Sequence, residues 1–199
     1  MQDFVSFFLL LIVITVFYVH LENKSLNVLY ITSKMDNKAY LVRNLPDKQE
    51  ACELLASLNL KFKTLIKILN DTLMQQNNYD KQKIEDIKRL KSNYNENYIS
   101  ESSPGNKHTS YSINKGEKIV FCLRAKDDTN KLIDINTITF VGIHELGHLM
   151  TKSIGHTKEF WDNMKFLLEV SIKNNLYIKQ DFKNSPVEYC GTKITDTPL

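Results

Sequence analysis

One short segment, residues 144–156, constrains this chain more than any other. It reads His-Glu-Leu-Gly-His-Leu-Met-Thr-Lys-Ser-Ile-Gly-His and contains three of the five histidines in the sequence. On an α-helix, residues four positions apart lie one turn above each other on the same face, so His144 and His148 can present two imidazole nitrogens to one metal ion. Glu145 lies beside this pair. The segment therefore predicts a helix that carries a metal site with an acid next to it.

Zinc is the ion that this arrangement favours. Zinc held by two or three neutral imidazoles keeps a coordination position open, and water bound there has its pKa lowered to about 7. Glu145 is placed to take the proton of that water. We therefore predict Zn2+ as the cofactor, His144 and His148 as ligands, and Glu145 as the catalytic general base.

The third metal ligand must come from outside this helical turn. His156 is our prediction, because Gly155 before it can adopt the positive φ that ends a helix and turns the chain back. Glu159 and Asp162, one or two helical turns further along, are the alternatives.

The amino-terminal segment is strongly apolar. Residues 4–21 have no permanent charge, and their length of about 27 Å at 1.5 Å per residue is close to the hydrocarbon thickness of a bilayer. A cleaved signal peptide is the alternative, but Asp3 stands where a basic region would be expected. We therefore predict that residues 1–24 form a single-pass transmembrane anchor, which makes the membrane a partner of the chain.

Charges and cysteines set the predicted location of the rest. Basic residues follow the apolar segment, beginning with Lys24, so the positive-inside bias places the later part in the cytoplasm. The three cysteines are odd in number, far apart, and lack the C-x-x-C spacing of a thiolate metal site. We interpret Cys52, Cys122 and Cys190 as reduced thiols in a reducing compartment.

The remaining chain is predicted to form one domain, residues 46–199, after a short connection. Residues 25–45 are polar with short apolar pieces, which is typical of either a tether or a peripheral strand. From Asp47, apolar residues recur at steps of three and four and predict an amphipathic helix, and a weaker pattern predicts a second helix around residues 84–90. A hydrophobic content of 42% suits a packed core.

A hairpin and two further helices complete this domain. Residues 109–113 and 118–123 read as paired strands, and either can align an extended substrate through main-chain hydrogen bonds. Asn136 or Thr137 is expected to cap the helix that carries the metal motif. This helix contains Gly142 and Gly147, which suggests that another element, the hairpin, packs very close to it.

The last part of the chain holds two aromatic residues of interest. After His156, Thr157 can cap a final helix, and we expect its Trp161 in the core and not in contact with substrate. Tyr189 is a candidate for stabilising the oxyanion of a tetrahedral intermediate, because tyrosine hydroxyls often have that role.

The charge pattern bears on possible partners. The net charge is +3, and the lysines are scattered among acidic residues and form no basic block. A nucleic-acid partner is therefore not indicated, whereas a protein or peptide substrate is expected.

Three stretches of the sequence resemble a known family. His144 to His148, followed by Gly155-His156-Thr157-Lys158-Glu159-Phe160-Trp161, is similar to the signature of the WLM and SprT-like zinc metallopeptidases. Residues 40–50, 111–118 and 186–191 resemble the WLM-like proteins of large nucleocytoplasmic DNA viruses. The resemblance implies an α+β zincin-like domain, with the three histidines as zinc ligands and Glu145 as the catalytic glutamate.

Two functions follow as hypotheses. The first is a membrane-anchored zinc metalloendopeptidase, on a viral or host membrane, in which Glu145 activates water for attack on a peptide bond. The alternative is a catalytically inactive structural or scaffolding membrane protein whose fold is stabilised by zinc.

Overall fold

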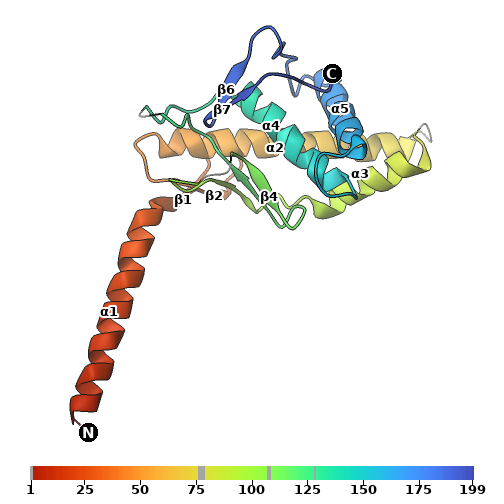
Figure 1. Ribbon diagram of the computed structural model, residues 1–199. Coiled ribbons are helices and arrows are strands. Elements are labelled where there is room, and N and C mark those ends of the chain that lie inside the picture. Colours follow the sequence, from red (N-terminus) through yellow and green to blue (C-terminus); the bar gives the residue numbers. More distant parts are fainter. Residues whose placement is uncertain (1, 76–78, 107–108, 128) are drawn as a thin grey trace.

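The computed structural model describes residues 2–75, 79–106, 109–127 and 129–199, and it describes no side chains for residues 2–4, 20–26 and 73–75. The chain belongs to the α+β class, as predicted (Figure 1). Its elements, in order, are α1 (Gln2–Leu26), β1 (Val28–Thr32), β2 (Ala39–Arg43), α2 (Lys48–Gln75), α3 (Lys81–Asn93), β3 (Ile99–Glu101), β4 (Tyr111–Ile113), β5 (Lys118–Phe121), α4 (Ile135–Met150), α5 (Lys158–Lys173), β6 (Val187–Tyr189) and β7 (Thr192–Ile194).

A mixed five-stranded sheet has the order β1-β2-β3-β5-β4. The three inner strands, β2, β3 and β5, are parallel to one another. The outer strands are antiparallel to their neighbours, with Val28 of β1 opposite Arg43 and Tyr111 of β4 opposite Val120. Residues 25–45, for which a tether was the alternative, therefore supply two strands. The predicted hairpin is β4 and β5, and β4 forms one edge of the sheet.

The helix α4 carries the metal motif through the centre of the core. It crosses α2 and lies beside α5 (Figure 1). The two glycines mark these crossings: a Cβ on Gly142 would lie 2.2 Å from Cζ of Phe62 in α2, and one on Gly147 would lie 3.1 Å from Cε2 of Phe160 in α5. The expected close approach is real, but the neighbours are two helices and not the hairpin.

The caps of α4 and α5 fix where each helix begins. The carboxylate of Asp134 accepts a hydrogen bond from the backbone N–H of Thr137 at 2.9 Å, so Asp134 is the N-cap of α4 and neither Asn136 nor Thr137 is. Thr157 caps α5 as predicted, and its hydroxyl accepts from the N–H of Phe160. These caps satisfy N–H groups that have no partner within the helix.

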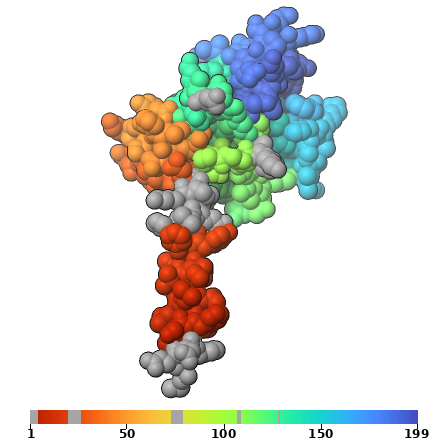
Figure 2. Space-filling model, turned by 60° about the vertical axis from the view of Figure 1, so that its left-hand side comes forward, coloured from red at the N-terminus to blue at the C-terminus, as the bar shows by residue number. Residues whose placement is uncertain are grey.

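The prediction of a single-pass transmembrane anchor is wrong, and the location inferred from it loses its basis. In the part of the chain that the structure describes, no helix combines the length and apolar character needed to cross a membrane. The helix α1 projects from the rest of the molecule (Figure 2).

The prediction of reduced cysteines is confirmed for Cys52 but is wrong for the other two. Cys122, just after β5, and Cys190, in the turn between β6 and β7, form a disulfide that links positions 68 residues apart. Cys52 is a free, buried thiol in α2. The inference of a reducing compartment rested on unpaired cysteines, so it falls with them.

Candidate metal centre

Three imidazole nitrogens converge at the centre of the predicted site. Nε2 of His144 lies 3.2 Å from Nε2 of His148 and 3.0 Å from Nε2 of His156. Two nitrogens that bind one tetrahedral zinc ion at 2.0–2.1 Å are about 3.3 Å apart. The spacing of the three rings therefore fits a single zinc ion, and the structure brings together all three histidines named from the sequence.

The protonation of these rings also suits a metal. Burial lowers the pKa of His144 to about 3 and, with the charges of His156 and Lys115, lowers the pKa of His148 to about 4. Both imidazoles are therefore neutral near pH 7, the form in which a ring nitrogen has a lone pair for a metal.

Aromatic packing from α5 holds the three rings in place. The ring of Phe160 stacks on His148 with centroids 4.3 Å apart and lies 4.8 Å from each of the other two histidines. Trp161 lies 5.5 Å from His156. Because Phe160 is fully buried, its ring provides a fixed surface against which the three imidazoles pack.

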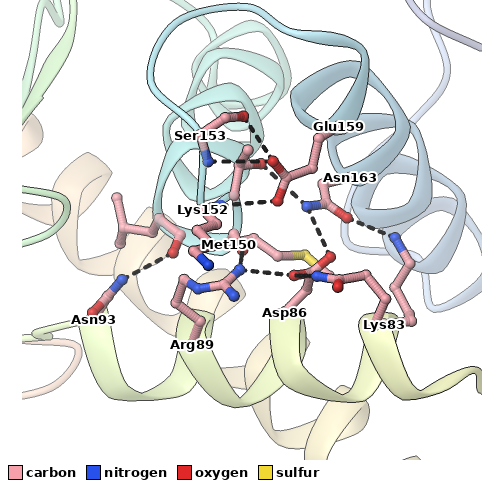
Figure 3. A network of polar contacts seen from close by, with 12 residues as sticks. Lys83, Asp86, Arg89, Asn93, Met150, Lys152, Ser153, Glu159 and Asn163 are labelled. Carbon is pink, nitrogen blue, oxygen red and sulfur yellow. Dashed lines mark hydrogen bonds and ion pairs between the residues drawn. The ribbon is translucent and has the colours of Figure 1, made fainter.

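The last turn of α4 is anchored through its carbonyl groups (Figure 3). The last carbonyls of a helix lack partners within it, and here α3 supplies them: Asn93 donates to the carbonyl of Leu149 at 3.0 Å, and Arg89 donates to that of Met150 at 2.7 Å. Gly155 then adopts φ +83°, as expected for the residue that turns the chain toward His156.

Lys115 extends this anchoring to the loop itself. Its ammonium donates to the carbonyls of residues 151, 152 and 153, at 2.8, 2.6 and 3.1 Å. Lys115 lies in the turn of the β4–β5 hairpin, where its own φ is +54°. A left-handed conformation at a lysine is uncommon. In this turn, the lysine with that conformation is the one whose ammonium contacts the loop that carries the third histidine.

Glu159 holds the same loop from the other side. Its carboxylate accepts hydrogen bonds from the N–H of Lys152 and from both the N–H and the hydroxyl of Ser153, at 3.0, 3.2 and 2.7 Å. Both carboxylate oxygens of Glu159, one of the two alternative third ligands, therefore accept hydrogen bonds from the loop. Asp162, the other alternative, is exposed and pairs with Lys158.

Behind the loop, polar side chains of α3 and α5 form a buried network. Asn163 donates to the hydroxyl of Thr151 at 3.1 Å and to Asp86 at 3.3 Å, and accepts from Lys83 at 2.6 Å (Figure 3). Asp86 in turn pairs with Arg89. The network ties the end of α4 to two other helices.

Glu145 lies beside the three rings and is 4% exposed. Burial raises the pKa of Glu145 to about 7, while hydrogen bonds from the hydroxyl and the backbone N–H of Ser112 act in the opposite direction. Ser112 belongs to β4, so the edge strand orients the carboxylate. The prediction that this acid stands next to the metal ligands agrees with the geometry.

These groups open into a cleft of about 520 Å3. One wall is the edge strand β4 with the residues around it, and the other is the motif helix and the loop before His156. The lining residues are Thr109, Ser110, Tyr111, Ser112, Asn114, Lys115, His144, Glu145, His148, Ser153, Ile154, Gly155 and His156.

Tyr189 does not reach the cleft. It is 2% exposed, and its hydroxyl donates to the carbonyl of Cys122 at 2.9 Å and meets the hydroxyl of Ser110 at 2.6 Å. The phenol therefore supports the strand behind the cleft and is not placed to stabilise an oxyanion.

Sequence reasoning missed several residues that shape this site. Lys115 and Ser112 appeared only as hairpin residues, and no local pattern marks a lysine or a serine that contacts a segment more than 30 positions away. Trp161, expected in the core, is 42% exposed. Its position directly after the buried Phe160 was the available signal, because adjacent helical residues point in different directions.

Comparisons with known proteins identify viral relatives of this chain. An uncharacterized protein of Acanthamoeba polyphaga mimivirus is 34% identical over 191 residues, which cover 96% of this chain and 94% of that protein. An uncharacterized protein of Invertebrate iridescent virus 3 is 35% identical over 68 residues, or 34% of this chain and 42% of that protein. The crystal structure of Wss1 from Saccharomyces cerevisiae matches with a TM-score of 0.34 and 24% identity, over 39% of this chain and 61% of Wss1.

The family itself is defined by a match over most of the chain. Residues 34–197 match the WLM domain, a range that begins before β2 and includes the three histidines and Glu145. The resemblance noted in the sequence, both to WLM proteins and to viral relatives, is confirmed. This chain belongs to the WLM domain family.

Proposed function

We propose that this WLM protein is a zinc-dependent endopeptidase that acts on proteins or extended peptides. The observation that carries the proposal is the convergence of three imidazole nitrogens beside a buried glutamate, at the floor of an open cleft. The spacing of these nitrogens and the neutral state of two of the rings fit zinc, and His144, His148 and His156 would hold the ion.

The donor set favours a catalytic over a structural metal. Within the described residues, the group of side chains close enough to share one ion consists of these three histidines. Structural zinc sites are usually closed by four protein ligands, whereas three protein ligands leave a position for water or substrate. Zinc bound here supplies a Lewis acid that favours loss of a proton from water in the cleft.

Glu145 performs the proton transfers. Its carboxylate, oriented by Ser112, accepts a proton from the attacking water and later passes it to the nitrogen of the leaving amine. Because Glu145 is almost fully buried, the carboxylate faces a single direction and bulk water has little access to it.

Strand β4 aligns the substrate. It is the last strand of the sheet, with β5 as its neighbouring strand, and its residues line the cleft that contains Glu145. An extended peptide that pairs with this edge by main-chain hydrogen bonds would pass over the metal centre. Such pairing selects an extended backbone without selecting a sequence.

The test uses the full chain loaded with zinc, incubated with unfolded casein, alongside the variant Glu145→Gln. The variant keeps the three nitrogens and removes the base, so it should bind zinc as the wild type does and lose at least about 100-fold in cleavage rate. Glu169→Gln makes the same change at a distant position of α5 and should cleave at the wild-type rate.

Two outcomes would contradict the proposal. Equal cleavage by the wild type and Glu145→Gln would show that the assigned base has no role. Zinc that raises the thermal stability of a protein that cleaves nothing would favour the zinc-stabilised scaffold instead.

A further inference from the structure

A second cavity adjoins the metal centre and is separate from the cleft. It has a volume of about 390 Å3 and lies between α4, α5 and the last residues of the chain. We call it the side cavity, and its lining residues apart from His144 are Phe140, Trp161, Met164, Asp196, Thr197 and Pro198. His144 lines both the side cavity and the cleft, so both spaces border a predicted metal ligand.

The helix geometry fixes how far the side cavity is from the reacting bond. Phe140, His144 and His148 follow one another at intervals of four on one face of α4, and the cavity lies at the Phe140 end. One turn of helix advances 5.4 Å, and an extended peptide advances about 3.3 Å per residue. A peptide bond held at the metal centre therefore has a side chain within one or two residues of the cavity.

The chemistry of the walls is apolar. Phe140 and Met164 are buried at 6% and 1% exposure, whereas Trp161 keeps 42% of its surface exposed. Its indole lies 6.3 Å from the ring of His144. An exposed indole beside a predicted reaction centre is a surface that a bound apolar group would cover.

The one charged side chain in the lining is the carboxylate of Asp196, which is exposed and accepts the N–H of Thr197 at 2.8 Å. An acidic group entering the side cavity would meet a like charge at its rim. A large uncharged side chain meets no such penalty.

We propose that the side cavity is a specificity subsite that receives a large apolar side chain of the substrate, from a residue one or two positions from the scissile bond. This inference rests on the proposed function and names its substrate preference. It follows from three observations: His144 lines both the cleft and the side cavity, the walls of the side cavity are apolar, and the indole of Trp161 is exposed.

Trp161 provides a direct measurement, because it is the only tryptophan in the chain. The probes are three acetylated pentapeptide amides, four glycines around a central Phe, Ala or Glu, added to the full-length Glu145→Gln variant with and without zinc. The emission of Trp161 should shift on binding of the Phe peptide. The Phe peptide should bind at least about tenfold more tightly than the Ala peptide and more tightly still than the Glu peptide.

A pair of variants separates the cavity from general binding. Thr197→Tyr places a ring in the side cavity from the tail and should remove the preference for Phe over Ala. Thr195→Tyr adds the same ring at an exposed position outside the lining and should leave the preference unchanged. Equal binding of the Phe and Ala peptides, or a preference that survives Thr197→Tyr, would overturn the assignment.

The outcomes also distinguish this inference from the proposed function. If the wild type cleaves casein but Glu145→Gln binds all three peptides with the same affinity, the activity is present and the subsite is absent. If instead the wild type cleaves nothing, and Glu145→Gln binds the Phe peptide more tightly than the others with a shift in the emission of Trp161, the subsite is present and the activity is absent.

Discussion

At the scale of single residues, Lys115 has the most testable role, because its ammonium contacts three carbonyls of the loop that carries His156. Lys115→Met removes these contacts and keeps a side chain of similar length. We expect the affinity for zinc to fall about 10- to 100-fold, the usual effect of losing a group that positions a metal ligand. Competition with a coloured chelator measures that affinity.

Two further variants test whether the ammonium itself is responsible. Lys115→Arg keeps a cation and should recover part of the affinity, and Lys118→Met, in the same hairpin, should bind zinc as the wild type does. The unfolding free energy of the zinc-free protein should change little in all three. Wild-type zinc affinity in Lys115→Met would show that the loop holds His156 without this lysine.

At the scale of elements, the crossing of α4 and α2 depends on Gly142. In Gly142→Ala the new methyl group would lie 2.2 and 2.9 Å from two atoms of the Phe62 ring, which is itself packed against Phe121. Overpacking of this kind costs about 1–3 kcal/mol, more than the roughly 1 kcal/mol that alanine gains over glycine in a helix. Urea unfolding should show a less stable protein.

Gly147 and Phe62 supply the comparisons for this prediction. Gly147→Ala meets Phe160 at 3.1 Å and nothing else closer than 3.5 Å, so its unfolding free energy should stay near that of the wild type. Adding Phe62→Leu to Gly142→Ala should destabilise by less than the sum of the two single changes. A fully stable Gly142→Ala protein would mean that α2 moves aside at no cost.

An ion pair joins the start of α2 to the end of β5 and makes the stability depend on pH. The buried guanidinium of Arg124 pairs with Glu101 and with Asp47, and its hydrogen bond and charge hold the pKa of Asp47 below the usual value. The resulting stabilisation is complete above the unfolded-state pKa of about 3.9. It is lost as the pH falls through the lower pKa of the folded state.

Asp47→Asn should therefore be less stable than the wild type at neutral pH, and the difference should shrink as the pH falls below about 4. Asp71→Asn removes the same charge from an exposed site in α2 and should follow the wild-type curve. Urea unfolding across this range measures both. A constant difference between Asp47→Asn and the wild type at every pH would exclude the ion pair as its cause.

Some elements were predictable from the sequence because each leaves a local pattern. The apolar periodicities of α2 and α5, the Thr157 cap and the hairpin turn depend on residues close together in the chain. The strands β3, β6 and β7 have three residues each, too few for an alternating pattern to be recognised. Asp134 was missed because several residues near the start of α4 have side chains that can cap a helix.

The clustering of the three histidines was predictable for a similar reason, since they lie within 13 residues on one helix and the following turn. Lys115, Ser112 and the side cavity depend on which segments the fold brings together, and this information is not local. The same limit explains the cysteines, since a separation of 68 residues gives no hint that two thiols meet.

At the scale of the whole molecule, the disulfide closes a loop that includes the three histidines, because the segment from Cys122 to Cys190 contains both α4 and α5. A cross-link of this length stabilises mainly by restricting the unfolded chain, with a typical contribution of about 2–4 kcal/mol. The double variant Cys122→Ala/Cys190→Ala should therefore unfold at a lower urea concentration. A reducing agent should lower the stability of the wild type and leave that of the double variant unchanged.

Zinc should stabilise the folded state independently of this cross-link. A ligand that binds only the folded protein adds a stabilisation set by its concentration and dissociation constant, and neither cysteine lies in the cleft. Saturating zinc should therefore raise the unfolding free energy by the same amount in the wild type and the double variant. A much smaller increase in the double variant would mean that the disulfide, by fixing the sheet behind Ser110, is needed to assemble the three histidines.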